Sequence, residues 1–182
     1  QASPMIATIH GIRQAIFFCH SGLVSLEAAT GKELWRFPFK FSVSTASTPV
    51  VGGRQNDVVY CSAGYGVGAG ACKITKEGDG FKATEIWRTP NENMNHWTTP
   101  VLLDGHLYGM FGFPHNSNAP LECHELATGK TVWSKEGFGT GGATILGGGT
   151  LVVQHDTGAI SLIDPKPDAF HEIARIQPLA GK

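Results

Sequence analysis

Short apolar stretches separated by glycine-containing turns run along the whole chain. Residues 48–51 and 58–61 are two such stretches, joined by a turn that contains Gly52 and Gly53. Turns of this kind connect antiparallel strands. The chain lacks the three-to-four-residue apolar period of an amphipathic helix. The pattern therefore predicts an all-β fold built from antiparallel hairpins.

The same order of four strand-like stretches occurs four times, and in three of the repeats the last stretch carries a Trp. The repeats are predicted at residues 3–40, 47–90, 98–139 and 142–179. First strands are predicted at 3–6, 48–51, 99–102 and 142–145, second strands at 16–19, 58–61, 107–110 and 151–154, and third strands at 23–26, 71–74, 121–124 and 160–163. A repeat of about 40–50 residues is typical of propeller blades or solenoid units.

Four short strands joined by tight turns make one small sheet with two faces to cover, and radial stacking of such sheets covers them. This predicts a β-propeller with four four-stranded antiparallel blades. A β-sandwich is the alternative. It is less favoured because a sandwich does not need a Trp at the same place in three successive units.

Two segments, residues 27–35 and 125–133, share an acidic residue, a Thr-Gly pair and a Trp four residues after the Gly. They resemble the tryptophan-docking repeat of quinoprotein-like propellers, and the whole chain resembles the bacterial proteins with pyrroloquinoline-quinone (PQQ)-like propeller repeats. The resemblance implies that each indole packs against a neighbouring blade. The residues assigned to this docking are Trp35, Trp87, Trp133, Thr30, Gly31, Thr128 and Gly129.

Two departures from the repeat stand out. Residues 75–81 lengthen the second unit, and Ala174 takes the Trp place in the fourth. We expect a smaller contact at Ala174, filled partly by Phe170 or Ile176.

The resemblance implies a propeller of six to eight blades, so four blades are expected to leave both ends uncovered. Further blades of the same polypeptide or a second copy would cover them. The residues expected to face missing neighbours are Met5, Ile6, Phe17 and Phe18 at one end, and Leu151, Val153 and Leu162 at the other.

Charge narrows the range of partners. The chain has 14 basic and 15 acidic residues and a formal net charge of -1, without a block of like charge. We therefore expect no nucleic-acid partner. Its apolar stretches are far shorter than the ~20 residues of a membrane helix, so no membrane span is expected. The family resemblance implies a periplasmic or secreted location.

Cysteine spacing excludes two kinds of site. Cys19, Cys61, Cys72 and Cys123 form no CxxC pair, which argues against a zinc knuckle and against a thioredoxin-type motif. The spacing is compatible both with buried free thiols and with disulfides.

Loops between second and third strands should emerge on the same side as the links between blades, and polar residues gather there. The candidate binding residues are His20, Asn93, His96, Trp97, His115, His155 and Asp156. A purely structural role is the alternative for each of them, because hairpin tips are polar in any protein and Trp97 could cover the edge between two blades.

The sequence lacks the adjacent Cys pair and the grouped carboxylates of a PQQ and calcium site, so no cofactor is expected unless residues outside this chain supply the site. The favoured hypothesis is a non-catalytic scaffold of the bacterial envelope that binds a protein or carbohydrate. One alternative is a fragment of a PQQ-dependent oxidoreductase. Another is an assembly role like that of the propeller lipoproteins of outer-membrane biogenesis.

Overall fold

The computed structural model describes residues 2–112, 119–140, 142–145 and 148–180. Within these residues the chain folds into four antiparallel sheets, each with its four strands in sequence order. The first sheet contains β1 (Met5–Ile9), β2 (Ile12–Cys19), β3 (Gly22–Glu27) and β4 (Glu33–Pro38). The second contains β5 (Val50–Gly52), β6 (Val58–Ala63), β7 (Gly68–Glu77) and β8 (Gly80–Pro90). The third contains β9 (Val101–Leu103), β10 (His106–Met110), β11 (Leu121–Glu125) and β12 (Thr131–Lys135). The fourth contains β13 (Ala143–Ile145), β14 (Leu151–Gln154), β15 (Ile160–Asp164) and β16 (His171–Ile176).

Two-residue turns with positive φ close the hairpins β1–β2 and β9–β10. His10 and Gly11 have φ of 48° and 79°, and Asp104 and Gly105 have 47° and 79°. Both φ values are positive, as in the type I′ turns that match the twist of antiparallel strands. The Gly-containing turns seen in the sequence thus fix the start of these sheets.

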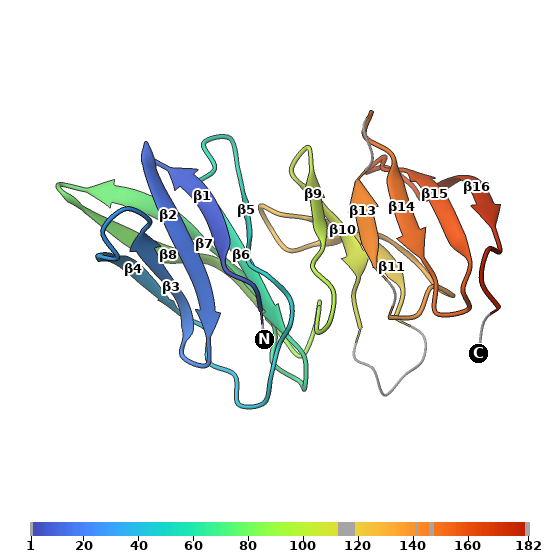
Figure 1. Cartoon of the computed structure of the whole chain (residues 1–182), viewed down its shortest axis with the longest axis horizontal. Coiled ribbons are helices and arrows are strands. Elements are labelled where there is room, and N and C mark those ends of the chain that lie inside the picture. Colours follow the sequence, from blue (N-terminus) through green and yellow to red (C-terminus); the bar gives the residue numbers. More distant parts are fainter. Residues whose placement is uncertain (1, 113–118, 141, 146–147, 181–182) are drawn as a thin grey trace.

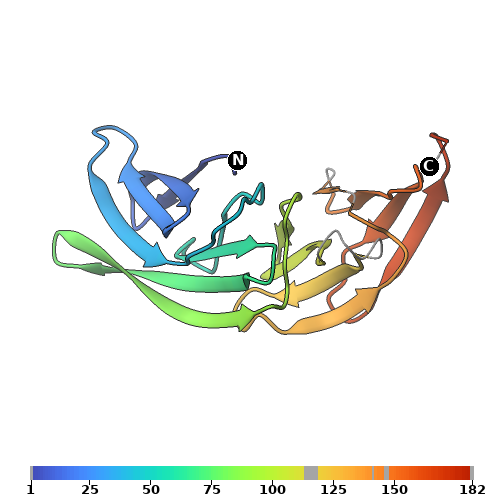
Figure 2. The ribbon, with the colours of Figure 1, turned by 90° about the horizontal axis from the view of Figure 1, so that it is seen from below.

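The sheets stand side by side along an arc (Figures 1 and 2). Their first strands lie on the inside of the arc, where β1 contacts β5, β5 contacts β9 and β9 contacts β13. This radial stacking distinguishes a propeller from a sandwich of two facing sheets. The predicted all-β propeller segment is confirmed.

The Trp residues occupy equivalent places in the first three sheets. Trp35 pairs with Ser25 on the neighbouring strand, Trp87 with Ala71 and Trp133 with Cys123. In the fourth sheet Ala174 pairs with Leu162. A β-bulge follows the paired residue on the third strand in all four sheets. The four repeats therefore share even the position of this β-bulge.

We call the face of each sheet that carries the Trp place its front face, and the opposite face its rear face. The front of each of the first three sheets packs on the rear of the next. Three apolar clusters result, and each joins one pair of neighbouring sheets. Tyr60 on the front of the second sheet, for example, shares a cluster with Leu107 on the rear of the third.

The two end sheets are far apart, at opposite ends of an open arc (Figure 2). The four sheets therefore do not close into a ring. The residues at the ends follow strand alternation, because side chains point to opposite faces along a strand. Ile6, Phe17 and Leu162 lie on the outer faces, as expected, and are exposed or half-buried.

Four residues expected to face missing neighbours do not lie on the outer faces. Phe18, Leu151 and Val153 are buried against a neighbouring sheet, and Met5 packs on the first cluster. The expectation about Ala174 is also wrong. Phe170 packs on Trp133, with ring centroids 5.7 Å apart, and Ala174 is exposed.

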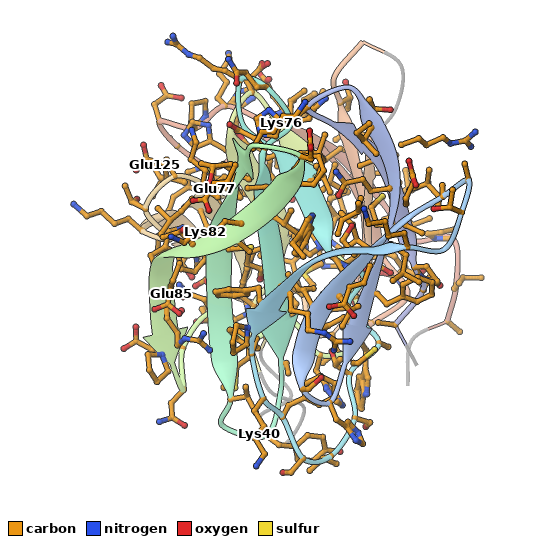
Figure 3. The ribbon with its side chains drawn as sticks, turned by 90° about the vertical axis from the view of Figure 1, so that its left-hand side faces the viewer. Lys40, Lys76, Glu77, Lys82, Glu85 and Glu125 are labelled. Carbon is orange, nitrogen blue, oxygen red and sulfur yellow. The ribbon has the colours of Figure 1, made fainter. Side chains whose placement is uncertain are left out.

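The lengthened second repeat forms the long β7–β8 hairpin, which reaches past the first sheet (Figure 2). Near its tip, the Phe81 ring stacks on His10 at 6.2 Å, and His10 Nε2 lies 2.8 Å from the carbonyl oxygen of Ile74. Lys82 and Glu77 form an ion pair at 3.6 Å on this hairpin (Figure 3). Charged side chains along an outermost strand discourage pairing with another chain.

Candidate functional site

The link between β8 and β9 is fixed by one buried amide. Asn95 is fully buried, and its Oδ1 accepts a hydrogen bond from the Tyr60 hydroxyl at 2.5 Å. Its Nδ2 donates to the carbonyl oxygen of Met110 at 2.5 Å, and its backbone N–H donates to Ser62 Oγ at 2.8 Å. The link is therefore tied to both the second and the third sheet.

Three aromatic rings lie next to this anchored link. His96 is buried, whereas the next residue, Trp97, is 55% exposed, with the two ring centroids 5.5 Å apart. Tyr65, in the turn between β6 and β7, meets His96 edge-to-face at 4.9 Å and is also exposed. Tyr65 was not among the candidates from the sequence. The positive φ of 58° that places it depends on a turn whose only sequence signal is the flanking Gly64 and Gly66.

A hollow of about 230 Å³, open mouth included, lies beside Trp97. It is lined by His96, Trp97, Thr98, Met110, Gly112, Ala119 and Thr140. Small-molecule sites usually enclose ~300–1,000 Å³. The enclosed part of this hollow has room for only about one water molecule, far below that range, so the hollow does not fit a cofactor.

Asp156 adjoins the same hollow through Thr140. Its Oδ2 accepts a hydrogen bond from the backbone N–H of Thr140 at 2.9 Å and also lies 3.2 Å from the Thr140 hydroxyl. The structure thus gathers three of the predicted residues, His96, Trp97 and Asp156, around one hollow.

A second, wider hollow of about 640 Å³ lies next to the first. It is lined by Phe18, Cys19, His20, Phe41, Val43, Ser44 and Thr45. Ala46 donates its backbone N–H to the carbonyl oxygen of His96 at 2.9 Å, so the segment that lines the second hollow is bonded to the link that lines the first. His20 is exposed here, with its ring edge-to-face on Phe41 at 5.0 Å. We call the surface of both hollows, with Tyr65 and Asp156, the loop face.

The remaining candidates lie elsewhere or have structural contacts. Asn93 donates its side-chain N–H to the carbonyl oxygen of Gly129 at 2.9 Å and so joins two sheets. His155 is buried and stacks on Phe138 at 4.1 Å, with Nε2 2.8 Å from Ser161 Oγ. His115 lies outside the described residues.

Burial governs the titration of the two buried candidate histidines. It lowers the pKa of His96 below the usual range. It also lowers the pKa of His155, although the carbonyl of Gly137 and the carboxylates of Glu172 and Asp156 act in the opposite direction. Both rings are therefore neutral at pH 7.

Among the described residues, no three His, Cys, Asp or Glu side chains are grouped so that they could hold a metal ion. In the same part of the chain, no helix has the length and apolar character needed to cross a membrane.

Comparisons with known proteins support the fold. No family model matches the sequence, and no curated protein matches it either. The crystal structure of BamB from Moraxella catarrhalis, a β-propeller, is similar, with a TM-score of 0.62 at 16% identity. The match covers 93% of this chain and 52% of that one, so the chain spans about half the length of the propeller it matches. Identity this low shows the fold alone.

Proposed function

We propose that this chain is a non-catalytic propeller scaffold that binds a protein partner through the loop face, with Trp97 at the centre of the contact. The observation that carries the proposal is the position of Trp97. Its ring is 55% exposed, yet it stands at the rim of a hollow and follows a link anchored by the buried Asn95.

An exposed Trp on a fixed backbone suits protein recognition. Trp is among the residues that most often dominate the binding energy of an interface. Because Asn95 ties the link to two sheets, little conformational entropy remains to be lost when a partner binds.

The scaffold is proposed to act in the bacterial envelope, either in the periplasm or after secretion. Two observations support this location: the resemblance of the tryptophan-docking repeats to PQQ-like propellers and the structural likeness to BamB. Fractionation of the native host, with detection of this chain in periplasmic or extracellular material, tests it. Recovery in the cytosol alone would contradict it.

A carbohydrate is the second candidate partner, because Tyr65 and Trp97 expose two aromatic rings close to one buried His96. Aromatic rings offer large rigid contact areas at low entropic cost. Titration with envelope oligosaccharides separates the candidates. Saturable perturbation of Tyr65 and Trp97 resonances would favour the sugar.

The test of the protein partner is photo-crosslinking in the native host. A photoreactive amino acid replaces Trp97 in one variant and Val132 in the control, since Val132 is also an exposed apolar side chain but lies on β12, away from the loop face. We expect one discrete protein adduct from position 97 and none of that mass from position 132. The same adducts from both positions, or none from position 97, would overturn the proposal.

The oxidoreductase alternative has its own test. Absorbance and mass spectrometry of protein purified from the native host would reveal a bound quinone and calcium. Near-stoichiometric amounts of both would replace the scaffold by a quinoprotein.

A further inference from the structure

The rear face of the first sheet is apolar and has no neighbouring sheet. Ile6, Ala15 and Leu26 lie opposite one another on β1, β2 and β3, and Phe17 lies opposite Val24 in the next row of that face. All five are half-buried or exposed, and Ile6 is 49% exposed. In the second sheet, residues on the corresponding face, such as Val59 and Cys61, are fully buried.

The front face of the fourth sheet is also apolar and also has no neighbouring sheet. Val152, Leu162 and Ala174 lie opposite one another on β14, β15 and β16, and Ile160 faces Ile176 in the next row. None of these five side chains is buried. A front face and a rear face are the two surfaces that form each internal joint of the arc, and one of each is left uncovered.

The joint between the first and second sheets shows how such faces meet. Arg88, on the rear of the second sheet, donates from Nη2 to the carbonyl oxygen of Pro38 at 2.8 Å. Its guanidinium also lies 4.5 Å from the ring centroid of Phe39. Glu85 holds the same guanidinium at 2.7 Å. Arg88, the residue after Trp87, therefore binds the end of the first sheet through both Pro38 and Phe39.

Arg36 occupies the corresponding position in the first sheet, one residue after Trp35. It is held by Glu33 in the same (i, i+3) arrangement, and its side chain is 57% exposed. Pro38, the acceptor at the internal joint, is the third residue after its Trp. The third residue after Ala174 is Gln177, which is exposed at the opposite end of the arc. Arg36 thus stands at the sequence position that makes the contact between sheets, but the fourth sheet of its own chain lies at the far end of the arc (Figure 2).

We propose that a second copy of this chain covers both faces. The front of the fourth sheet of each copy packs on the rear of the first sheet of the other, and Arg36 of each copy donates to the carbonyl oxygen of Gln177 in the other. Two arcs of four sheets then close a ring with two identical joints. The chain matches about half of the BamB propeller, so two copies supply a ring of that size.

The front-to-rear contact between copies explains why the assembly closes into a ring. A front-to-rear contact joins two different surfaces, and such contacts produce either a ring or an open filament. An arc of half a ring closes after two copies. It leaves no apolar sheet face exposed to water, which soluble proteins generally avoid.

The first measurement is the mass of the 182-residue chain in solution, by sedimentation equilibrium. We expect a species of twice 19.4 kDa at micromolar concentration. A monomer at 100 µM would overturn the proposal. Blades other than those of a second copy would then have to cover the two faces. A ladder of masses beyond the dimer would overturn the closed ring.

Paired variants test the front-to-rear contact itself. Phe17→Glu blocks the rear face and Leu162→Glu blocks the front face, so each variant alone should be monomeric. Mixed in equal amounts, they should form a heterodimer through the one unblocked pair of faces. If either variant still dimerises alone, the copies pair front to front or rear to rear and the proposal fails.

Controls keep this result interpretable. Val132→Glu places the same charge at an exposed apolar position of the third sheet and should leave the dimer intact. Each variant must keep the wild-type far-ultraviolet circular dichroism, and Ile6→Glu replaces Phe17→Glu if the latter unfolds. Arg36→Ala should weaken dimerisation about tenfold or more, since a charge-assisted hydrogen bond is lost at both joints. An unchanged dissociation constant would remove Arg36 from the joint.

Discussion

The indole ring of Trp87 lies directly on Gly129 of the next sheet. A Cβ atom at residue 129 would come within 2.7 Å of the ring, and Trp87 Nε1 donates to the carbonyl oxygen of Leu126 at 2.8 Å. The turn formed by Thr128 and Gly129 in the third sheet is thus the surface on which Trp87 of the second sheet rests.

This contact predicts unequal costs for the same substitution in two equivalent turns. Gly31 and Gly129 both have positive φ, 75° and 72°, but a Cβ at residue 31 meets nothing within 4 Å. Gly31→Ala should therefore show only the backbone strain, about 1–2 kcal/mol. Gly129→Ala should lose about 1–3 kcal/mol more through overpacking against Trp87. Urea unfolding of both variants checks this, and equal losses would mean that Trp87 does not rest on the turn in solution.

Trp35 should contribute more to stability than Trp133. Trp35 is buried, and its Nε1 donates to Gln14 Oε1 at 2.8 Å, whereas Trp133 is only half-buried. We expect Trp35→Ala to cost about 3–5 kcal/mol and Trp133→Ala clearly less. The comparison is the midpoint and slope of urea unfolding for each variant. A larger loss at Trp133 would show that the two indoles are packed differently from the structure.

The buried hydrogen bond between Tyr60 and Asn95 predicts a strong coupling. Asn95→Ala leaves the buried Tyr60 hydroxyl without its acceptor, at a cost of about 1–3 kcal/mol. Tyr60→Phe should be milder, because Asn95 keeps its bond to the carbonyl oxygen of Met110. The double variant should cost less than the sum of the two single losses. Additive losses in a double-mutant cycle would show that the two side chains are independent.

Stability should fall as the pH is lowered through the usual range of histidine. The folded state keeps His155 neutral because burial lowers its pKa, whereas the unfolded chain binds a proton near pH 6.5. Below about pH 6.5 the unfolded state therefore holds more protons, and the free energy of unfolding decreases. His155→Gln should lose less stability than wild type between pH 7.5 and 5.5. Identical slopes for the variant and the wild type would exclude His155 as the source.

Thiol reactivity should separate Cys19 from the other cysteines. Burial raises the pKa of Cys72 to about 12 and that of Cys123 to about 11, and it raises the pKa of Cys61 as well. Cys19 is exposed. At pH 8 the native protein should show one rapidly reacting thiol, and Cys19→Ser should abolish it. More than one fast thiol in native Cys19→Ser would contradict the buried positions.

The sequence predicted the strands and the equivalent Trp places well, because both depend on local signals: glycine turns, alternating apolar residues and a Thr-Gly-Lys turn four residues before a Trp. It did not predict which partner each indole meets. Trp87 and Trp133 donate to the next sheet, but Trp35 donates to Gln14 of its own sheet. The second repeat lacks the Thr-Gly turn on which Trp35 would rest.

The candidate site was harder to predict, since burial of a hairpin residue depends on distant partners. His155 and His96 have similar polar surroundings in the sequence. In the structure the stacking of Phe138 makes His155 part of the core, whereas His96 lines a hollow beside the exposed Trp97. Tyr65 joined the site only through the backbone conformation of its turn.

The three apolar clusters have a consequence for how the chain loses its structure. Among the described residues each cluster spans two neighbouring sheets, and the fourth sheet shares no cluster with the first or second. Stability then resembles a sum of nearest-neighbour terms along a line. In the isolated monomer, unfolding is expected to start at an end sheet and progress inward, with amide hydrogens of β15 exchanging before those of β6. In such an array the middle sheets are stabilised by having a neighbour on each face, as well as by their own residues.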